Sequence, residues 1–159
     1  MVDLIWRVLI IGLAATALID IWAIVLNKLA GIAKPNWAMV GRWFGHLPRG
    51  EVFHDDIAKS APIANELALG WCAHYAVGIA FAAALVFFAG AGWLATPTFL
   101  PAWIVGIVTV GFGWFLLQPG LGLGWAASKR PNAMQIRGLN LVSHTIFALG
   151  LYGAALLLR

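Results

Sequence analysis

Four long runs of apolar residues, separated by three segments rich in glycine, proline and charged residues, dominate the pattern of the chain. A helix of about 20 apolar residues is long enough to cross a bilayer. Pro62 stands where the first turn of a helix tolerates proline, and Pro119 ends the third run. The pattern predicts an all-α, four-helix transmembrane bundle in one domain, residues 1–159, with spans over residues 5–29, 62–88, 100–118 and 136–158.

Composition supports this membrane architecture. Hydrophobic residues make up 62% of the chain and charged residues only 10%, whereas soluble domains carry about 25% charged residues. The basic residues behind the net charge of +4 lie in segments between apolar runs rather than on one exposed face, which argues against nucleic acid as a partner. Cys72 is the single cysteine, so no disulfide framework is expected. We therefore expect membrane lipids around the chain.

The three connecting segments differ in length and charge. Residues 30–61 are mixed in charge, and we expect a partly ordered loop with a short interfacial helix over 35–44 that places Trp37, Trp43 and Phe44 among lipid headgroups. Residues 89–99 carry no charge, and the flanking Trp93 and Trp103 predict an aromatic belt. Of the ten Lys and Arg residues, all except Arg7 and Arg159 lie on the side of the first and third segments. The positive-inside rule then predicts that these segments are cytoplasmic and that both termini lie outside.

Three ionisable side chains interrupt the apolar runs at a similar depth. Asp20, His74 and His144 each lie seven or eight residues from a charged residue near the cytoplasmic end of their span. At 1.5 Å per residue, all three sit roughly 10–12 Å below one interface. Ionisable groups inside a membrane usually face a partner or water, so we expect them to form one intramembrane polar layer. Four polar residues nearer that end of the spans predict a cytoplasmic mouth to the layer: Glu66, Gln118, Arg137 and Asn140.

The residue types in this layer leave several chemistries open. A carboxylate with two imidazoles can form a hydrogen-bond network that fixes helix register, or it can relay a proton or ion. Two histidines and a carboxylate also ligate zinc or iron, and His74 with His144 could hold a b-type haem between two spans. The Cys-x-x-Cys-His motif that attaches haem covalently is absent. The sequence therefore assigns no cofactor and leaves a metal ion and b-type haem as candidates.

Two further clusters lie outside the spans. His46, His54 and Asp55 are weaker metal candidates, since adjacent histidine and aspartate in a loop are usually a solvated surface or a helix cap. Lys129 and Arg130 are candidate contacts for anionic lipid headgroups. The Gly-x-Ser-x-Gly and His-Glu-x-x-His patterns are absent. No catalytic residue is therefore assigned, and a non-enzymatic role is favoured.

Four stretches together resemble a family of small bacterial inner-membrane proteins that is catalogued only as a domain of unknown function. The stretches are 35–46 (PNWAMVGRWFGH), 66–75 (ELALGWCAHY), 118–128 (QPGLGLGWAAS) and 144–152 (HTIFALGLY). The resemblance covers nearly the whole chain. It implies a four-helix protein of the bacterial inner membrane with no established activity, so it transfers no catalytic residues.

The leading functional hypothesis is a small membrane protein that binds or conducts a small solute, ion or proton through the Asp20, His74 and His144 layer. Four short helices enclose little volume, which favours a homo-oligomer. The competing hypothesis is a non-catalytic accessory subunit of a larger membrane complex, in contact with protein, lipid or pigment. A haem- or metal-binding membrane protein is the third.

Overall fold

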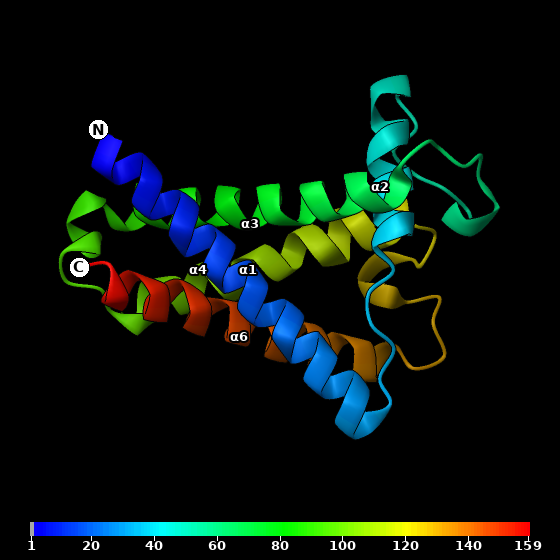
Figure 1. Cartoon of the computed structure of the whole chain (residues 1–159). Coiled ribbons are helices and arrows are strands. Elements are labelled where there is room, and N and C mark those ends of the chain that lie inside the picture. Colours follow the sequence, from blue (N-terminus) through cyan, green and yellow to red (C-terminus); the bar gives the residue numbers. More distant parts are fainter. Residues whose placement is uncertain (1) are drawn as a thin grey trace. The chain divides into compact units, whose positions relative to one another are not determined.

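The computed structural model describes residues 2–159, which form helices joined by loops. Three spans are single α-helices: α1 (Val2–Ala30), α3 (Glu66–Ala89) and α6 (Ala133–Leu157) (Figure 1). The remaining span consists of α4 (Phe99–Phe112), the π-helical turn η4 (Gly113–Leu117) and α5 (Gln118–Gly120). All four spans are long and apolar enough to cross a membrane. The predicted all-α architecture with four transmembrane helices is therefore confirmed.

One helix begins later than its apolar run predicts. α3 starts at Glu66 rather than at Pro62. Asn65 has a φ of +57°, a left-handed conformation that asparagine tolerates but that interrupts a right-handed helix. The Glu66 carboxylate accepts the backbone N–H of Ile63 at 3.4 Å and closes the turn that precedes the helix. Local backbone conformation therefore sets this boundary, although the hydrophobic pattern continues through it.

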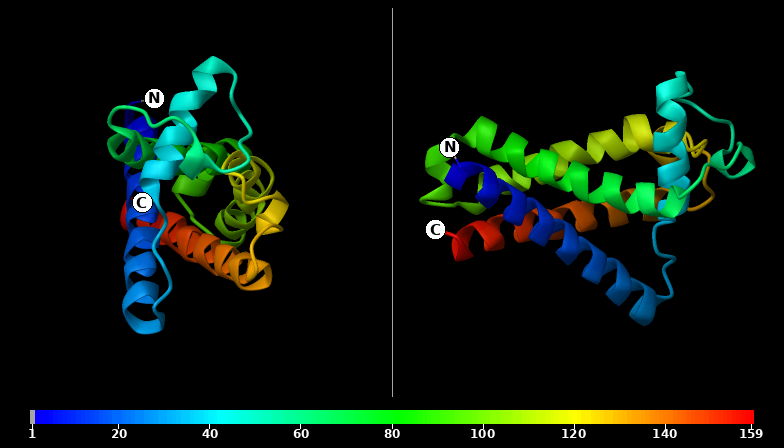
Figure 2. Two further views of the ribbon diagram at one scale, coloured as in Figure 1. Left: turned by 90° about the vertical axis from the view of Figure 1, so that its right-hand side faces the viewer. Right: turned by 45° about the horizontal axis from the view of Figure 1, so that its top comes forward.

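The chain divides into two compact units that interleave along the sequence. The first contains residues up to Lys34, Tyr75–Thr109 and Leu141–Arg159, and the second contains Pro35–His74 and Val110–Asn140. The first unit thus holds α1, most of α3, the short helix η3 (Ala91–Leu94) and most of α6. The start of α1, η3 and the end of α6 lie together at one end of this unit (Figures 1 and 2).

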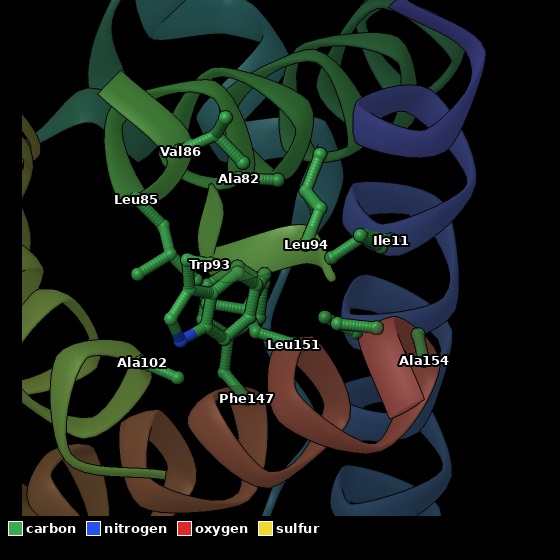
Figure 3. Packing of buried hydrophobic residues seen from close by; sticks show 12 residues of the cluster. Ile11, Ala82, Leu85, Val86, Trp93, Leu94, Ala102, Phe147, Leu151 and Ala154 are labelled. Carbon is green, nitrogen blue, oxygen red and sulfur yellow. The ribbon is translucent and has the colours of Figure 1, made fainter. Parts of the chain in front are cut away.

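A buried apolar cluster forms the core of the first unit, with Trp93 of η3 near its centre (Figure 3). Trp93 is only 6% exposed, and its Nε1–H donates to the carbonyl oxygen of Thr98 at 3.1 Å. Its indole lies among side chains of α3 and α6, including Leu85, Phe147 and Leu151 (Figure 3). The prediction that Trp93 belongs to an interfacial belt is therefore wrong, because the loop after α3 folds it back into the core. Trp103, by contrast, remains exposed.

Glycine residues let the helices of the first unit approach closely. A Cβ atom at Gly12 of α1 would lie 2.6 Å from Cα of Ile79 in α3. A Cβ atom at Gly150 of α6 would lie 2.6 Å from Cα of Ala15 in α1. Membrane helices associate mainly through such close van der Waals packing, because lipid provides no hydrophobic drive between them. Gly12 and Gly150 therefore let α1 pack closely against α3 and α6.

The second unit is built on α2 (Trp37–His46), which runs steeply across the first turns of α3 (Figures 1 and 2). The Asn36 side chain caps α2 by accepting the backbone N–H of Met39 at 3.4 Å. The predicted short helix over 35–44 is therefore present. Its Trp43 is buried, however, so the prediction that Trp43 lies among lipid headgroups is wrong. The indole is instead hydrogen-bonded to the loop that follows α2.

Candidate functional site

Three metal-ligating side chains meet at the end of α2. His46 is the last residue of that helix, and Glu51 and His54 follow the short helix η1 (Leu47–Arg49). Gly50 has a φ of +79°, a left-handed conformation that lets the chain reverse directly after η1. One ligand atom from each of the three side chains lies within 4.8 Å of the other two. The group offers two imidazoles and a carboxylate, a donor set found in zinc and iron sites.

The backbone determines which nitrogen of each imidazole carries the hydrogen. Nε2 of His46 lies 2.9 Å from the carbonyl oxygen of Ala61, and Nδ1 of His54 lies 2.8 Å from that of Gly120. A carbonyl oxygen only accepts, so both of these nitrogens donate. The other two nitrogens, His46 Nδ1 and His54 Nε2, carry lone pairs when the rings are neutral, and they face each other at 2.9 Å. Two lone pairs at this distance repel unless a proton or a cation lies between them.

The spacing of the ligand atoms is close to that around a metal ion. Zinc–nitrogen bonds are about 2.0–2.1 Å long, so two imidazole nitrogens on a tetrahedral zinc are about 3.3 Å apart. His46 Nδ1 and Glu51 Oε2 are 3.4 Å apart, and the two imidazole nitrogens at 2.9 Å need only a small separation. Metal-ligating histidines usually donate their second N–H to a carbonyl or carboxylate, as both rings do here. The residues therefore fit a metal centre in ligand type, spacing and outer hydrogen bonds.

The three ligand side chains differ in exposure to solvent. The His46 side chain is only 1% exposed, whereas the Glu51 side chain is 53% exposed. His54 is half-buried. An ion could therefore enter from the solvent side past Glu51 and reach an anchored imidazole, which gives the centre the entry path that a metal site needs.

Trp43 and Gly120 hold the ligand loop in place. The Trp43 Nε1–H donates to the carbonyl oxygen of Val52 at 2.7 Å, which fixes the residue after Glu51. A Cβ atom at Gly120 would overlap the Trp43 indole and lie 3.0 Å from that same carbonyl oxygen. Only glycine therefore lets this backbone approach closely enough for its carbonyl to accept from His54. The two bonded residues, His54 and Gly120, are 66 positions apart in the sequence.

Arg42 holds in place the part of the loop between His54 and the start of α3. Its guanidinium donates to both carboxylate oxygens of Glu66 at 2.8 and 2.9 Å. Its Nη1 also donates to three backbone carbonyl oxygens, those of Ile57, Ala58 and Ser60. Hydrogen bonding to Glu66 raises the pKa of Arg42, so the guanidinium remains charged although it is buried. These bonds fix η2 (Ile57–Lys59) and the chain up to Ala61, whose carbonyl accepts from His46.

The residues of the predicted intramembrane layer each have a defined environment. In the first unit, the Asp20 carboxylate accepts the hydroxyl hydrogen of Tyr75 at 3.0 Å. Also in that unit, His144 Nδ1 donates to the carbonyl oxygen of Gly106 at 2.9 Å. In the second unit, the His74 ring stacks on Trp37 with ring centroids 3.9 Å apart. Because Asp20 and His144 belong to one unit and His74 to the other, a common layer remains a prediction.

The four residues of the predicted cytoplasmic mouth all belong to the second unit, where they make three separate sets of contacts. Asn140 Oδ1 accepts from Gln118 Nε2 and from Trp114 Nε1, each at 3.0 Å. Glu66 is instead committed to Arg42. The Arg137 Nε–H donates to the carbonyl oxygen of Ala126 at 2.8 Å. The structure thus brings Gln118 and Asn140 together, while Glu66 and Arg137 bond to other parts of the chain.

Sequence reasoning identified both histidines of the loop cluster but not their acidic partner. Asp55 is exposed and, among the described residues, stands outside the group of three, in which Glu51 provides the carboxylate. Glu51 lies between the two histidines in the sequence, and this position is the one feature of the sequence that points to it as a third ligand. Lys129 and Arg130, the predicted lipid contacts, are exposed in the loop after η5 (Trp125–Ala127).

Among known proteins, this chain matches a protein family. Neither the curated proteins nor the solved structures contain a significant match to this chain. One protein family matches residues 9–158, which include most of α1, the other three spans and the whole loop cluster. The chain therefore belongs to the family described as protein of unknown function (DUF2938).

Proposed function

We propose that this membrane protein binds a divalent transition-metal ion, such as Zn²⁺, through His46, Glu51 and His54. The observation that carries the proposal is the pair of imidazole lone pairs facing each other at 2.9 Å, with both opposite nitrogens held by backbone carbonyls. A cation between the rings removes the repulsion and uses both lone pairs. Glu51 then supplies the third ligand and one negative charge.

The donor set favours some ions over others. Imidazole nitrogen suits Zn²⁺, Cu²⁺, Ni²⁺ and Fe²⁺, whereas Mg²⁺ and Ca²⁺ require mostly oxygen ligands. Three protein ligands leave one position of a tetrahedral ion open to water or to another ligand. We therefore expect an exchangeable ion with selectivity for borderline transition metals over alkaline-earth metals.

Direct binding measurements on the purified, chelator-treated protein test this proposal. We expect one Zn²⁺ per chain by calorimetry and elemental analysis, and no binding of Mg²⁺ at equal concentration. Each of His46→Ala and His54→Ala should weaken Zn²⁺ binding at least 100-fold, because two remaining ligands do not hold the ion tightly. Glu51→Gln should weaken Zn²⁺ binding less than either histidine variant does, since the Glu51 side chain is half exposed and water can take its place on the ion.

Matched variants of the same residue types separate this centre from the other candidates. Asp55→Asn changes an exposed carboxylate next to His54 and should bind Zn²⁺ as the natural chain does. His74→Ala and His144→Ala should also retain the ion. Binding that persists in both His46→Ala and His54→Ala but disappears in His144→Ala would reject the loop centre and place the metal in the spans.

The cellular setting is part of the same proposal. The distribution of Lys and Arg supports cytoplasmic placement of the first and third connecting segments in a bacterial inner membrane, with both termini outside. The metal centre then faces the cytoplasm. Assembly as a homo-oligomer, or as a subunit of a larger membrane complex, would supply additional contacts for the exposed apolar helix faces.

A second candidate function is transfer of a proton through the spans, and the Tyr75 to Asp20 hydrogen bond favours it. A carboxylate inside an apolar helix is costly and often marks a proton path. We expect proton flux into liposomes that contain the protein, and at least a tenfold decrease in Asp20→Asn, which cannot carry the proton. Asp3→Asn, at an exposed carboxylate near the end of α1, is the control. Unchanged flux in Asp20→Asn would exclude this role for Asp20.

A further inference from the structure

The loop between α5 and α6 carries two exposed cations, Lys129 and Arg130. All six acidic residues lie at or before Glu66, so residues 67–159 contain none. Lys129, Arg130 and Arg137 fall within that range. Among the described residues, ion pairs involve other cations, such as Arg42 and Lys59, and none includes these three. The side chains of Lys129 and Arg130 are therefore available to an anion from outside the chain.

The loop holds its charged residues on a well-defined backbone. The backbone N–H of Lys129 donates to the carbonyl oxygen of Leu123 at 3.0 Å, and that of Arg130 donates to Ala127 at 2.9 Å. The Arg137 side chain also holds this turn, because its Nε–H donates to the carbonyl oxygen of Ala126 at 2.8 Å. Since the backbone is already ordered, binding of an anion by these side chains costs little further backbone entropy.

Apolar rings adjoin the cationic loop. The Trp125 side chain belongs to a residue that is 63% exposed, and its ring lies 5.7 Å from that of Phe115 in η4, which is 52% exposed. Phe115 belongs to a membrane span, and tryptophan is enriched at the boundary between hydrocarbon and headgroups. The order from span to loop is therefore an apolar ring, an interfacial indole and then two exposed cations.

We propose that Phe115, Trp125, Lys129 and Arg130 form a binding surface for one anionic phospholipid. The phosphate lies between Lys129 and Arg130, and the acyl chains run along Trp125 and Phe115. The two cations provide charge complementarity to the headgroup, and the adjoining rings favour a membrane lipid over a soluble anion. This surface does not depend on the proposed metal centre.

Native mass spectrometry with added lipid tests the surface. Purified protein is titrated with phosphatidylglycerol or with phosphatidylcholine of identical acyl chains. We expect retention of one phosphatidylglycerol per chain, bound at least ten times more tightly than phosphatidylcholine. The double variant Lys129→Gln with Arg130→Gln should weaken phosphatidylglycerol binding about 10- to 30-fold, because each cation near an anionic surface contributes several-fold in affinity. Trp125→Ala should weaken both lipids.

A matched double variant controls for total charge. Lys34→Gln with Arg49→Gln removes the same charge from exposed positions in the first connecting segment and should leave phosphatidylglycerol binding unchanged. An equal loss in both double variants would overturn the proposal, as would equal retention of the two lipids. Displacement of the lipid by millimolar glycerol phosphate would also overturn it, because a soluble phosphate would then be the better ligand.

Discussion

Zn²⁺ at about one hundred times its dissociation constant is expected to raise the midpoint of thermal unfolding of the purified protein by about 5–10 °C. A ligand that binds only the folded chain stabilises it by about 2.7 kcal/mol at that excess. For a chain of this size, each kcal/mol shifts the midpoint by about 2–4 °C. The metal would also join the end of α2 to the loop at Gly120 through His54, so it should resist opening of the second unit. The midpoint can be followed by tryptophan fluorescence in detergent.

The control for this prediction is the same titration on His54→Ala, which should show no shift with Zn²⁺. Asp55→Asn should show the full shift, and Mg²⁺ should produce none with any variant. A Zn²⁺ shift of equal size in His54→Ala would mean that the stabilising ion binds elsewhere in the chain. Addition of a chelator should return the natural protein to its metal-free midpoint.

Gly41→Ala is expected to destabilise the protein by about 3 kcal/mol or more, or to prevent its accumulation in the membrane. A Cβ atom at Gly41 would overlap the carbonyl oxygen of Glu66 and lie 2.6 Å from the backbone nitrogen of Gly70. Overpacking costs typically 1–3 kcal/mol, and it costs more where backbone rather than a flexible side chain must move. Displacement of α2 would also move His46, so Zn²⁺ binding should weaken in the protein that does fold.

Gly138→Ala provides the matched control. Gly138 lies in α6, and no atom comes within 4 Å of a Cβ atom built there. Alanine has the higher helix propensity, so this variant should be unchanged or more stable by up to about 1 kcal/mol. Yield and unfolding midpoint measured for both variants decide the comparison. Similar stability of Gly41→Ala and the natural chain would show that α2 and α3 tolerate a wider separation.

The span boundaries show how far hydrophobic patterning reaches. Apart from the start of α3, each helical span begins and ends within about three residues of its predicted limit, as expected for helix ends. Lipid offers no hydrogen-bond partners to the backbone. A long apolar run therefore forms a helix, in which the backbone N–H and C=O groups bond within the same segment. The start of α3 differs because Asn65 and the Glu66 side chain form a polar turn that hydropathy does not detect.

The loops show where such patterning stops. The sequence predicts that Trp93 and Trp43 lie at the membrane interface, but both are buried. The indole N–H of Trp93 donates to the carbonyl oxygen of Thr98, and that of Trp43 donates to the carbonyl oxygen of Val52. The sequence around a tryptophan therefore does not distinguish a buried position from an interfacial one. A buried position requires a hydrogen-bond acceptor for the indole N–H, which the fold supplies here.

The sequence by itself determined the membrane class, the number of spans and the presence of histidines in the first connecting segment. These follow from composition and local periodicity, which act within about 20 residues. Only the tertiary structure decided that Glu51 rather than Asp55 joins His46 and His54. It also decided which ring nitrogens carry lone pairs, because the His54 N–H donates to the carbonyl of Gly120, 66 positions away in the chain. Contacts across such sequence distances depend on the path of the whole backbone, which local patterns do not encode.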